Sequence, residues 1–433
     1  MSFKESIHIK NVGPIRELRI DDIRPLIVLI GASATGKSTL MKVLALMRYI
    51  YKMENIRSYL LDSTGIQRSP FRLEFKNLLK DGLMGAFSKD SEVEYTAYHR
   101  DRSYTICYKG GKLQNKMRIA TEHLLFFKEA YVVEERGAMA AFLSERSDKR
   151  QKLGTEDLPT VRSKDLGFYF NDTLKDLQHA LNESPNLSIK HLGVLLAVKK
   201  GRDNKKRYLI SNQLDKEMIE IDLKYSSSGI QASTPIVSLL QYFARDFSFE
   251  RAVRRSIFSY LWDDYYLQSL NFQSLAESVE LPRHVHLYIE EPELNLFPTA
   301  QCALLNLAVE EAFVNKKEDR ELSLMIATHS PYIANYINVL LRKSRLGETG
   351  LCEEDFDVYL LVDGKAISLI GEDEDTHERV VDTFPLTEAM EEIYNEYVSL
   401  GDHVGENEDT EEGTVDGSHG DIYNDYVTIE EHE

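Results

Sequence analysis

The chain has 433 residues, with 52 Lys and Arg against 71 Asp and Glu, and its formal net charge at pH 7 is −19. Twelve of the acids and none of the bases lie in residues 401–433, which leaves a charge of −7 for residues 1–400. A protein held to nucleic acid only by overall positive charge is excluded, because phosphate contacts need Lys or Arg. A local basic patch remains compatible with these numbers. At 42% hydrophobic residues the chain can bury a core, which excludes global disorder.

The cysteines and the apolar runs indicate the compartment. Cys107, Cys302 and Cys352 are odd in number and lack metal-ligand spacing, which favours a reducing environment without a disulfide framework. The first residues contain no apolar stretch typical of a signal peptide. No apolar run reaches the roughly 18 residues of a membrane span. We therefore expect a cytoplasmic protein without a membrane partner.

Taken in chain order, the patterns predict an α/β protein. Residues 5–30 predict two or three strands, ending in a continuous apolar run that is typical of a strand buried on both faces. An apolar helix is expected directly after residues 31–39. Asp363-Gly364 predicts the turn of a late hairpin over residues 357–370. The remaining predictions are a hairpin in residues 189–224, strands at residues 285–289 and 322–327, and helices at residues 232–247, 299–315, 331–341 and 384–400.

The most specific motif is GASATGKST, in which two glycines enclose four residues and are followed by Lys37 and Ser38. This is the pattern of a phosphate-binding loop. Glycines let backbone N–H groups face one phosphate cluster, Lys37 reaches the β- and γ-phosphates, and Ser38 offers its hydroxyl to Mg²⁺. The alternative is a chance match, but the strand before the motif and the helix after it favour an ATP and Mg²⁺ site. The candidate nucleotide-binding residues are Gly31, Ala32, Ser33, Ala34, Thr35, Gly36, Lys37, Ser38 and Thr39.

Two adjacent acids follow a second apolar strand in HLYIEEPELNLFP, residues 286–298. Glu290 and Glu291 stand where α/β sheets place their ligands, at the carboxyl end of a strand. One carboxylate can hold Mg²⁺ while the next polarises the attacking water. A solvated acidic turn is the alternative, and the phosphate loop upstream favours the catalytic interpretation.

Two weaker motifs complete the set. His329 follows a third strand in LMIATHSP and could donate a hydrogen bond to the γ-phosphate, although a lone histidine is more often structural. Ser227, Ser228 and Gly229 precede a predicted helix, whose N-terminus is an anion site, although such Ser-Gly runs are also ordinary turns.

In this order the motifs resemble those of the ABC-type P-loop ATPases, in the soluble branch with OLD-, RecF- and SMC-like heads. IEEPELNLFP resembles the Walker B and D-loop of OLD-like ATPases, ATHSP resembles their His switch, and SSGIQ resembles a relaxed signature motif. AYVVEERG, residues 130–137, resembles a strand-plus-arginine element of these heads. Two positions depart from the family: Glu290 stands where Asp is usual, and Ile230 where Gly, Glu or Gln is common. No Q-loop can be placed.

The resemblance covers about residues 5–55 and 190–370, and it implies an ABC-type head with a mixed central sheet flanked by helices. It also implies that two heads sandwich ATP, so that Ser227, Ser228 and Gly229 contact nucleotide on the partner. The expected divisions are residues 1–55 and 191–345 as the two parts of the head, residues 56–190 as an inserted α+β lobe, residues 346–400 as a hairpin and helix, and residues 401–433 as a disordered acidic tail.

Three further segments carry open alternatives. A basic cluster around one hairpin turn is either a solvated turn or a contact to a nucleic-acid backbone. The aromatic segment of residues 258–270 is expected in the core or at a subunit contact rather than stacking on bases. The acidic tail is inert, mimics nucleic acid or docks a basic partner. The basic cluster consists of Lys199, Lys200, Arg202, Lys205, Lys206 and Arg207.

The resemblance extends to stand-alone ATPases of anti-phage systems such as Septu and PARIS, which act with a separate effector. Only 104 residues follow His329, too few for a hairpin, a helix, the tail and a further nuclease domain of about 100 residues. We therefore expect an ATPase that switches an effector in trans and has no nuclease of its own. The alternative is a RecF- or SMC-like ATPase of DNA repair or maintenance; a membrane-transporter ATPase fits less well, because it predicts a shorter chain with a strict signature.

Overall fold

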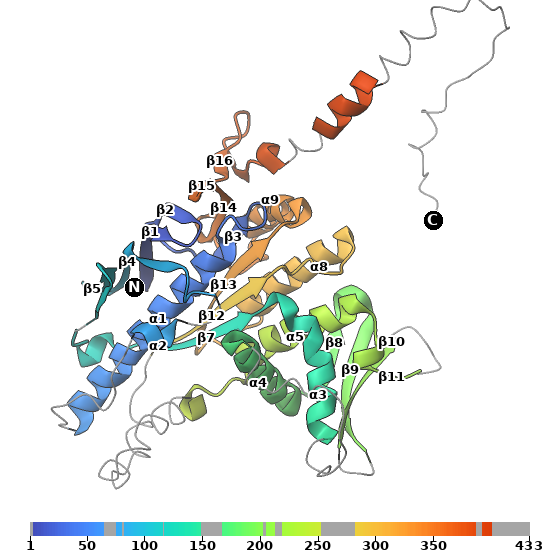
Figure 1. Ribbon diagram of the computed structural model, residues 1–433. Helices are drawn as coiled ribbons and strands as arrows, with labels where there is room; N and C mark the ends of the chain where they lie inside the picture. The colour runs from blue at the N-terminus through green and yellow to red at the C-terminus, as the bar shows by residue number, and fades with distance from the viewer. Residues whose placement is uncertain are drawn as a thin grey trace, which may run out of the picture. The chain divides into compact units, whose positions relative to one another are not determined.

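A six-stranded mixed sheet lies at the centre of the unit Met1–Thr383 (Figure 1). The computed structural model describes residues 3–64, 75–79, 82–115, 117–148, 167–201, 205–212, 219–252, 282–386 and 392–400. The sheet has the order β15-β14-β3-β13-β12-β7, and only the edge strand β15 is antiparallel to its neighbour. Its strands are β3 (Leu26–Ile30), β7 (Phe126–Val132), β12 (Arg283–Glu290), β13 (Glu321–Thr328), β14 (Phe356–Val362) and β15 (Lys365–Ser368).

The apolar runs form the parallel strands because both faces of this sheet are covered. All five residues of β3 are buried, as its continuous apolar sequence predicts. The register pairs Ile30 with Thr328 and Ala327 with Glu290, so that neighbouring strands finish level with each other. The segments that follow β3, β12, β13 and β7 therefore leave the sheet at the same edge.

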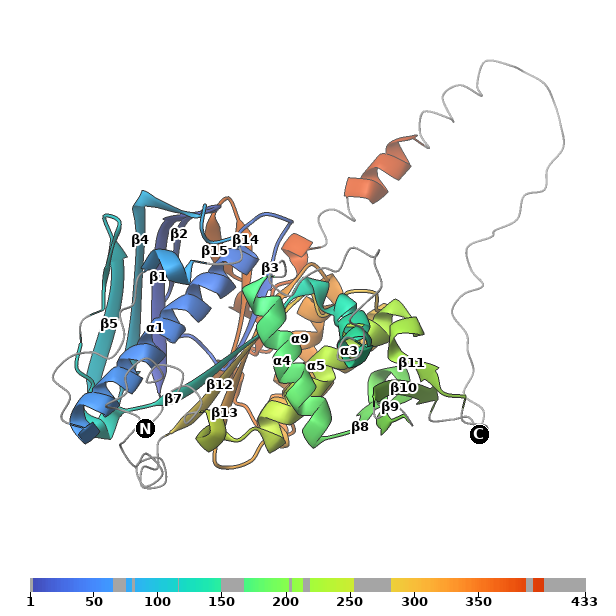
Figure 2. The ribbon, with the colours of Figure 1, turned by 60° about the horizontal axis from the view of Figure 1, so that its bottom comes forward.

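A second, antiparallel sheet lies on the other side of the long helix α1 (Lys37–Thr64), as Figure 2 shows. Its order is β2-β1-β4-β5-β6. The residues of α1 between 40 and 51 are mostly buried, because the helix packs against both sheets. The strands are β1 (Lys4–Val12), β2 (Ile15–Ile20), β4 (Phe87–His99), β5 (Arg102–Lys109) and β6 (Lys112–Gln114), and α2 (Phe75–Leu78) is a short helix in the same part of the chain.

Further helices and a small four-stranded sheet complete the unit, and of these helices α4 (Phe168–Glu183) packs against β7 (Figure 1). The small sheet has the order β11-β10-β9-β8. Its strands are β8 (Asn186–Ile189), β9 (Val194–Lys200), β10 (Lys206–Asn212) and β11 (Ile221–Asp222). The helices are α3 (Met139–Asp148), α4 (Phe168–Glu183), α5 (Ser228–Gln241), α8 (Pro298–Val309) and α9 (Pro331–Arg345).

Two of these helices continue into π-helical turns that are bonded to each other. α5 runs into Tyr242–Asp246, and α8 runs into Glu310–Val314. An ion pair joins them, since Arg245 Nη2 lies 2.7 Å from Glu311 Oε1. The helices expected over residues 232–247 and 299–315 are therefore present, with a π-helical end in each.

The fold class is α/β with a mixed central sheet flanked by helices, as expected, but the chain is divided differently from the sequence prediction. The range 56–190 does not form one inserted lobe: β4, β5 and β6 belong to the antiparallel sheet, and β7 belongs to the central sheet. The hairpin of residues 357–370 is present, yet its first strand pairs in parallel with β3 and so extends the central sheet. Long-range strand pairing overrides the boundaries that the local composition suggested.

Residues 384–433 form a separate unit, in which residues 384–386 and 392–400 are helical. The acidic tail of residues 401–433 and the aromatic segment of residues 258–270 both lie outside the described residues. In the parts of the chain that the structure does describe, no helix is both long and apolar enough to cross a bilayer.

Candidate nucleotide-binding site

The glycine-rich motif forms the turn between β3 and α1. Gly31 and Gly36 have positive φ angles of 146° and 108°. A Cβ atom at Gly31 would lie 2.5 Å from the carbonyl oxygen of Leu361, and one at Gly36 would lie 3.0 Å from Ile15 Cγ1. Both glycines are therefore required by the backbone, and the loop delivers the N-terminus of α1, a favourable place for phosphate.

Lys37 is the cation of this loop. Only 6% of the residue is exposed, and its Nζ donates hydrogen bonds to the carbonyl oxygens of Gly31 at 2.7 Å and Ala32 at 2.9 Å. Burial lowers the pKa of Lys37, and the charges of Glu291 and Glu293 oppose that shift. The ammonium thus bonds to weak neutral acceptors that a phosphate oxygen would replace with a charged one.

The loop borders a cavity of about 230 Å³ at the carboxyl ends of the parallel strands. This cavity brings together residues from the phosphate loop, the two-glutamate motif and the ATHSP motif. Its lining is Pro14, Ser33, Ala34, Thr35, Gly36, Lys37, Ser38, Thr39, Glu134, Glu290, Glu291, Ala327 and His329.

Glu290 is the last residue of β12 and is 7% exposed. Its Oε1 accepts a hydrogen bond of 2.8 Å from the hydroxyl of Tyr131, on the neighbouring strand β7. Burial, followed by the charge of Glu290, raises the pKa of Tyr131 well above its usual value, which keeps this phenol a donor. The contact orients the carboxylate, as the partners of metal ligands commonly do.

Glu291 adopts a left-handed backbone conformation, with φ at 43°. Its N–H donates to the carbonyl oxygen of Ala327 at 2.8 Å, and its Oε1 lies 3.3 Å from His329 Nε2. Burial and then the charge of Glu134 raise the pKa of Glu291, while His329 and Lys37 act against them. A strained backbone and a shifted carboxyl group at one residue are typical of functional sites.

His329 follows β13 and is held by a residue that the sequence analysis did not select. Glu293 Oε1 accepts a hydrogen bond of 2.6 Å from the main-chain N–H of His329. Ser330 then caps α9 by accepting from the N–H of Ile333 at 3.3 Å. The histidine is thereby fixed between the acidic turn and the start of a helix.

The signature candidates lie outside this cavity. Ser227 precedes α5, and the side chains of Ser227 and Ser228 are exposed. Gly229 is buried, and a Cβ atom there would lie 2.7 Å from the carbonyl oxygen of Asn295, in the turn that follows Glu291. The serines are therefore presented outwards, on a helix that touches the acidic turn.

Glu134 and Arg136 also belong to the site, although the sequence indicated only the segment that contains them, residues 130–137. Both lie in a 3-10 turn, Glu134–Ala138, that follows β7. Since β7 pairs in parallel with β12, this turn meets the acidic turn at the same sheet edge. The AYVVEERG segment was thus a usable indication, but its pairing partner is about 150 residues away in sequence.

The residues present fit ATP with Mg²⁺. Among the described residues, no group of three or more His, Cys, Asp and Glu could hold a metal by itself. That is compatible with Mg²⁺, which usually takes one or two carboxylates together with substrate phosphates and water. Ser38 and Glu290 both line the cavity and would serve as its protein ligands.

The basic cluster lies in the β9–β10 hairpin, apart from Arg202, which lies outside the described residues. The pairing sets Lys200 opposite Lys206 and Lys199 opposite Arg207. Two of the lysines have partners of their own: Lys199 Nζ pairs with Glu220, and Lys206 Nζ donates to Asn182.

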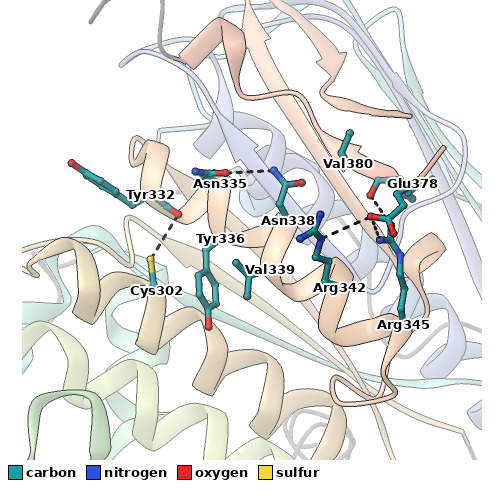
Figure 3. Close-up of a pocket in the computed structure, with 11 residues that line it drawn as sticks. Cys302, Tyr332, Asn335, Tyr336, Asn338, Val339, Arg342, Arg345, Glu378 and Val380 are labelled. Carbon is teal, nitrogen blue, oxygen red and sulfur yellow. Dashed lines mark hydrogen bonds and ion pairs between the residues drawn. The ribbon is translucent and has the colours of Figure 1, made fainter. Parts of the chain in front are cut away.

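A separate groove of about 420 Å³ runs along α9, beside α8 and the hairpin of β16 (Ile370–Glu372) and β17 (Arg379–Val381), as Figure 3 shows. Tyr336 and Val339 contribute apolar surface, and Arg345 Nη1 lies 2.5 Å from Glu378 Oε2. Although larger than the cavity at the phosphate loop, the groove offers paired charges, whereas Lys37 in the cavity bonds only to main-chain carbonyls among the contacts of the described residues. The cavity is therefore the better candidate for a nucleotide site.

No protein-family profile and no curated protein sequence matches the chain. Among solved structures, the chain is similar to the SMC head domain from Thermotoga maritima, at 10% identity and a TM-score of 0.34 over 86% of this chain and 100% of that one. It is also similar to the recombination mediator RecF, at 13% identity and a TM-score of 0.32 over 85% and 98% of the two chains. A dimeric ATP-binding cassette with ADP and Pi matches at 10% identity and a TM-score of 0.28, over 83% and 96%. Similarities at these TM-scores do not indicate a function, so a function can be inferred only from the residues of the site.

Proposed function

We propose that the chain binds and hydrolyses ATP with Mg²⁺ as an ABC-type ATPase. The observation that carries the proposal is the convergence of Lys37, Glu291 and His329 on one cavity. A cation on a glycine-rich loop, facing carboxylates at the ends of neighbouring parallel strands, matches the needs of phosphoryl transfer, which depends on positioning and charge stabilisation.

Each side chain has a role that follows from its contacts. Lys37 and the loop hold the phosphates, and Ser38 and Glu290 are the ligands for Mg²⁺, which when bound would screen the phosphate charge. Glu291 accepts the proton of the attacking water, and its raised pKa makes it a stronger base than an ordinary glutamate. His329 lies 3.3 Å from Glu291 and donates to the γ-phosphate.

The site is completed by a second head. Ser227 and Ser228 are exposed at the start of α5 and do not line the cavity of their own chain. In the proposed assembly they contact the nucleotide of a partner subunit, and the N-terminus of α5 faces its phosphates. ATP would then close a homodimer or higher homo-oligomer, and hydrolysis would reopen it.

The substitution Glu291→Gln tests the proposal. It keeps the size of the side chain and removes the base, so turnover should fall by about 10²- to 10⁴-fold while ATP still binds. ATP-dependent assembly, followed by light scattering after gel filtration, should then persist instead of decaying. Glu321→Gln, at the opposite end of β13, is the matched control. Undiminished hydrolysis in the Glu291 variant would overturn the assignment.

We further propose that ATP-driven closure makes this protein the sensor of an anti-phage system, controlling an effector in trans. The support is the sequence resemblance of the Walker B and His-switch motifs to OLD-like ATPases. Affinity capture of the Glu291→Gln protein with ATP should recover a dedicated effector. Capture of DNA-repair or replication proteins instead would favour a RecF- or SMC-like role.

One observation favours nucleic acid as a second ligand. Like charges directly opposite each other on neighbouring strands destabilise a sheet, so the Lys200–Lys206 pair is costly without an anionic partner, whereas Lys199, opposite Arg207, already pairs with Glu220. Charge reversal at Lys200 and Arg207 leaves the Lys199–Glu220 and Lys206–Asn182 contacts intact. It should weaken DNA binding and reduce the dependence of the affinity on salt concentration. Unchanged affinity and salt slope would leave the cluster as a solvated turn.

A further inference from the structure

A single buried arginine connects the catalytic turn to the helix that carries the signature candidates. Arg136 is 0% exposed. Its Nη1 donates to the carbonyl oxygen of Glu290 at 2.6 Å and to that of Val133 at 3.2 Å. Its Nη2 donates to the carbonyl oxygen of Glu291 at 2.6 Å, and its Nε to that of Ala232 at 3.0 Å. Three segments are therefore tied to one planar group: the exit of β7, the turn after β12, and α5.

All four of these hydrogen bonds end on main-chain carbonyls, which leaves the nearby carboxylates available. Burial lowers the pKa of Arg136 to about 10, so the guanidinium remains charged at neutral pH. A cation beside Glu290 and Glu291 could have formed ion pairs with their side chains, which would compete with metal and water. It instead bonds to their backbone and stabilises the left-handed conformation of Glu291.

A second contact joins the same two parts. Gly229, at the start of α5, approaches the turn after Glu291 so closely that a Cβ atom would meet the Asn295 carbonyl oxygen at 2.7 Å. α5 therefore touches the catalytic turn both directly at Gly229 and through Arg136 at Ala232. A displacement of α5 cannot leave the backbone of Glu291 unchanged while both contacts hold.

We infer that Arg136 is a positioning residue that transmits the arrival of a second subunit at α5 to the catalytic carboxylate of Glu291. The inference rests on the proposed ATPase function and deepens it. Contact between a partner and Ser227 or Ser228 shifts α5, Arg136 carries that shift to the carbonyl of Glu291, and the carboxylate moves into line for water. Hydrolysis thus follows assembly, because only the assembled state aligns the base.

The test compares Arg136→Met and Arg136→Lys with Arg320→Met. Arg320 is a matched control because it is also buried and also donates to main-chain carbonyls, those of Phe243 and Phe247, just beyond α5 and outside the cavity lining. Lys restores the charge at position 136 but lacks the planar fork that reaches several carbonyls at once. The measurements are the dissociation constant for ATP, ATP-dependent assembly in a Glu291→Gln background, kcat, and thermal unfolding.

We expect both Arg136 variants to lose about 10- to 100-fold in kcat. ATP affinity and assembly should stay within about twofold of wild type, since Lys37 and Ser227 are untouched; a purely structural role would lower all of them together. Arg320→Met should reduce stability without separating assembly from turnover. If Arg136→Met does not fold, Arg136→Lys alone carries the comparison.

Full turnover in Arg136→Lys, or loss of ATP binding and assembly in a folded variant, would overturn the inference. The wild-type protein separates this failure from that of the underlying function. If wild type does not hydrolyse ATP, the proposed function fails. If wild type hydrolyses ATP and the Arg136 variants match it, only the coupling role fails.

Discussion

Charged side chains have different kinds of partner at the two ends of the parallel strands. At the carboxyl ends lies the cavity of about 230 Å³, with Lys37 and the glutamates. At the amino ends lies a larger cavity of about 660 Å³, bordered by Pro25, Pro282 and Leu322, which stand at or next to the first residues of β3, β12 and β13. The larger cavity is also lined by charged and histidine side chains, so neither its size nor its composition sets it apart from a binding site.

The pairing of those charges does set it apart. At the amino ends, Arg48 Nε donates to Glu5 Oε1 at 2.8 Å and its Nη1 to the Tyr288 hydroxyl at 2.7 Å. Asp22 is 3.3 Å from Lys4 and 3.1 Å from Arg24. At the carboxyl ends, the buried cation Arg136 bonds to carbonyls instead. The acids at the amino ends are therefore paired with arginine or lysine, whereas the buried arginine at the carboxyl ends leaves the side chains of Glu290 and Glu291 without an ion pair to it.

The largest expected effect comes from breaking the buried pair at the amino ends. Arg48→Met should lower the free energy of unfolding by about 3–5 kcal/mol, because it leaves the Glu5 carboxylate buried without its cation. Denaturant unfolding measures this loss. Adding Glu5→Gln should recover much of it, and ATP affinity should not change. A large loss of ATP affinity in a folded Arg48 variant would contradict the separation of the two ends.

Removing one lysine from each cavity sharpens the contrast. Lys37→Ala should weaken ATP binding by about 100-fold, the value of a lost charge-assisted contact of roughly 2–3 kcal/mol. Lys4→Ala, in the amino-end cavity, should leave the affinity within about twofold. Calorimetric titration with ATP and Mg²⁺ gives both numbers, and equal effects of the two changes would refute the assignment of the site.

The pH dependence of turnover reports on the acids that line the nucleotide cavity. In the proposed function Glu291 acts as a base only when ionised, and its raised pKa means that activity should be lost on acidification at a higher pH than for an ordinary glutamate. Glu134→Gln removes one of the causes that raise this pKa, so the acidic limb of kcat should move to lower pH. A limb that stays in place, or moves to higher pH, would contradict this origin of the shift.

The smallest effect is expected from a partly exposed pair at the amino ends. Lys316 Nζ lies 3.1 Å from Glu321 Oε2, whose side chain is 65% exposed. Solvent screens such a pair, so Lys316→Ala should change the free energy of unfolding by about 0–1 kcal/mol and leave turnover unchanged. A loss comparable to that of Arg48→Met would show that burial does not distinguish the two pairs.

Local sequence was enough to predict the elements that carry the candidate site. The glycines at 31 and 36, the apolar run before them and the acids after β12 are contiguous patterns whose geometry depends on nearby residues. Because parallel strands end level with each other, the sequence pattern also predicted that Lys37, Glu291 and His329 lie at the same edge of the central sheet. Their catalytic roles remain predictions.

Contacts between distant segments could not be predicted in this way. No local pattern shows that β7 pairs with β12, that β14 joins the head beside β3, or that Arg136 bonds to the carbonyls of Glu290 and Glu291. These depend on packing between parts of the chain separated by more than 100 residues. Segmenting the chain by composition therefore misplaced the middle and the final hairpin.

The left-handed conformation of Glu291 has a consequence for directed evolution. Glycine adopts such a φ without steric cost, and asparagine tolerates it better than glutamate does. A selection that rewards only heat resistance should therefore enrich Gly or Asn at position 291 and abolish the proposed hydrolysis. Retention of glutamate under such a selection would measure how strongly catalysis, rather than folding, constrains this position.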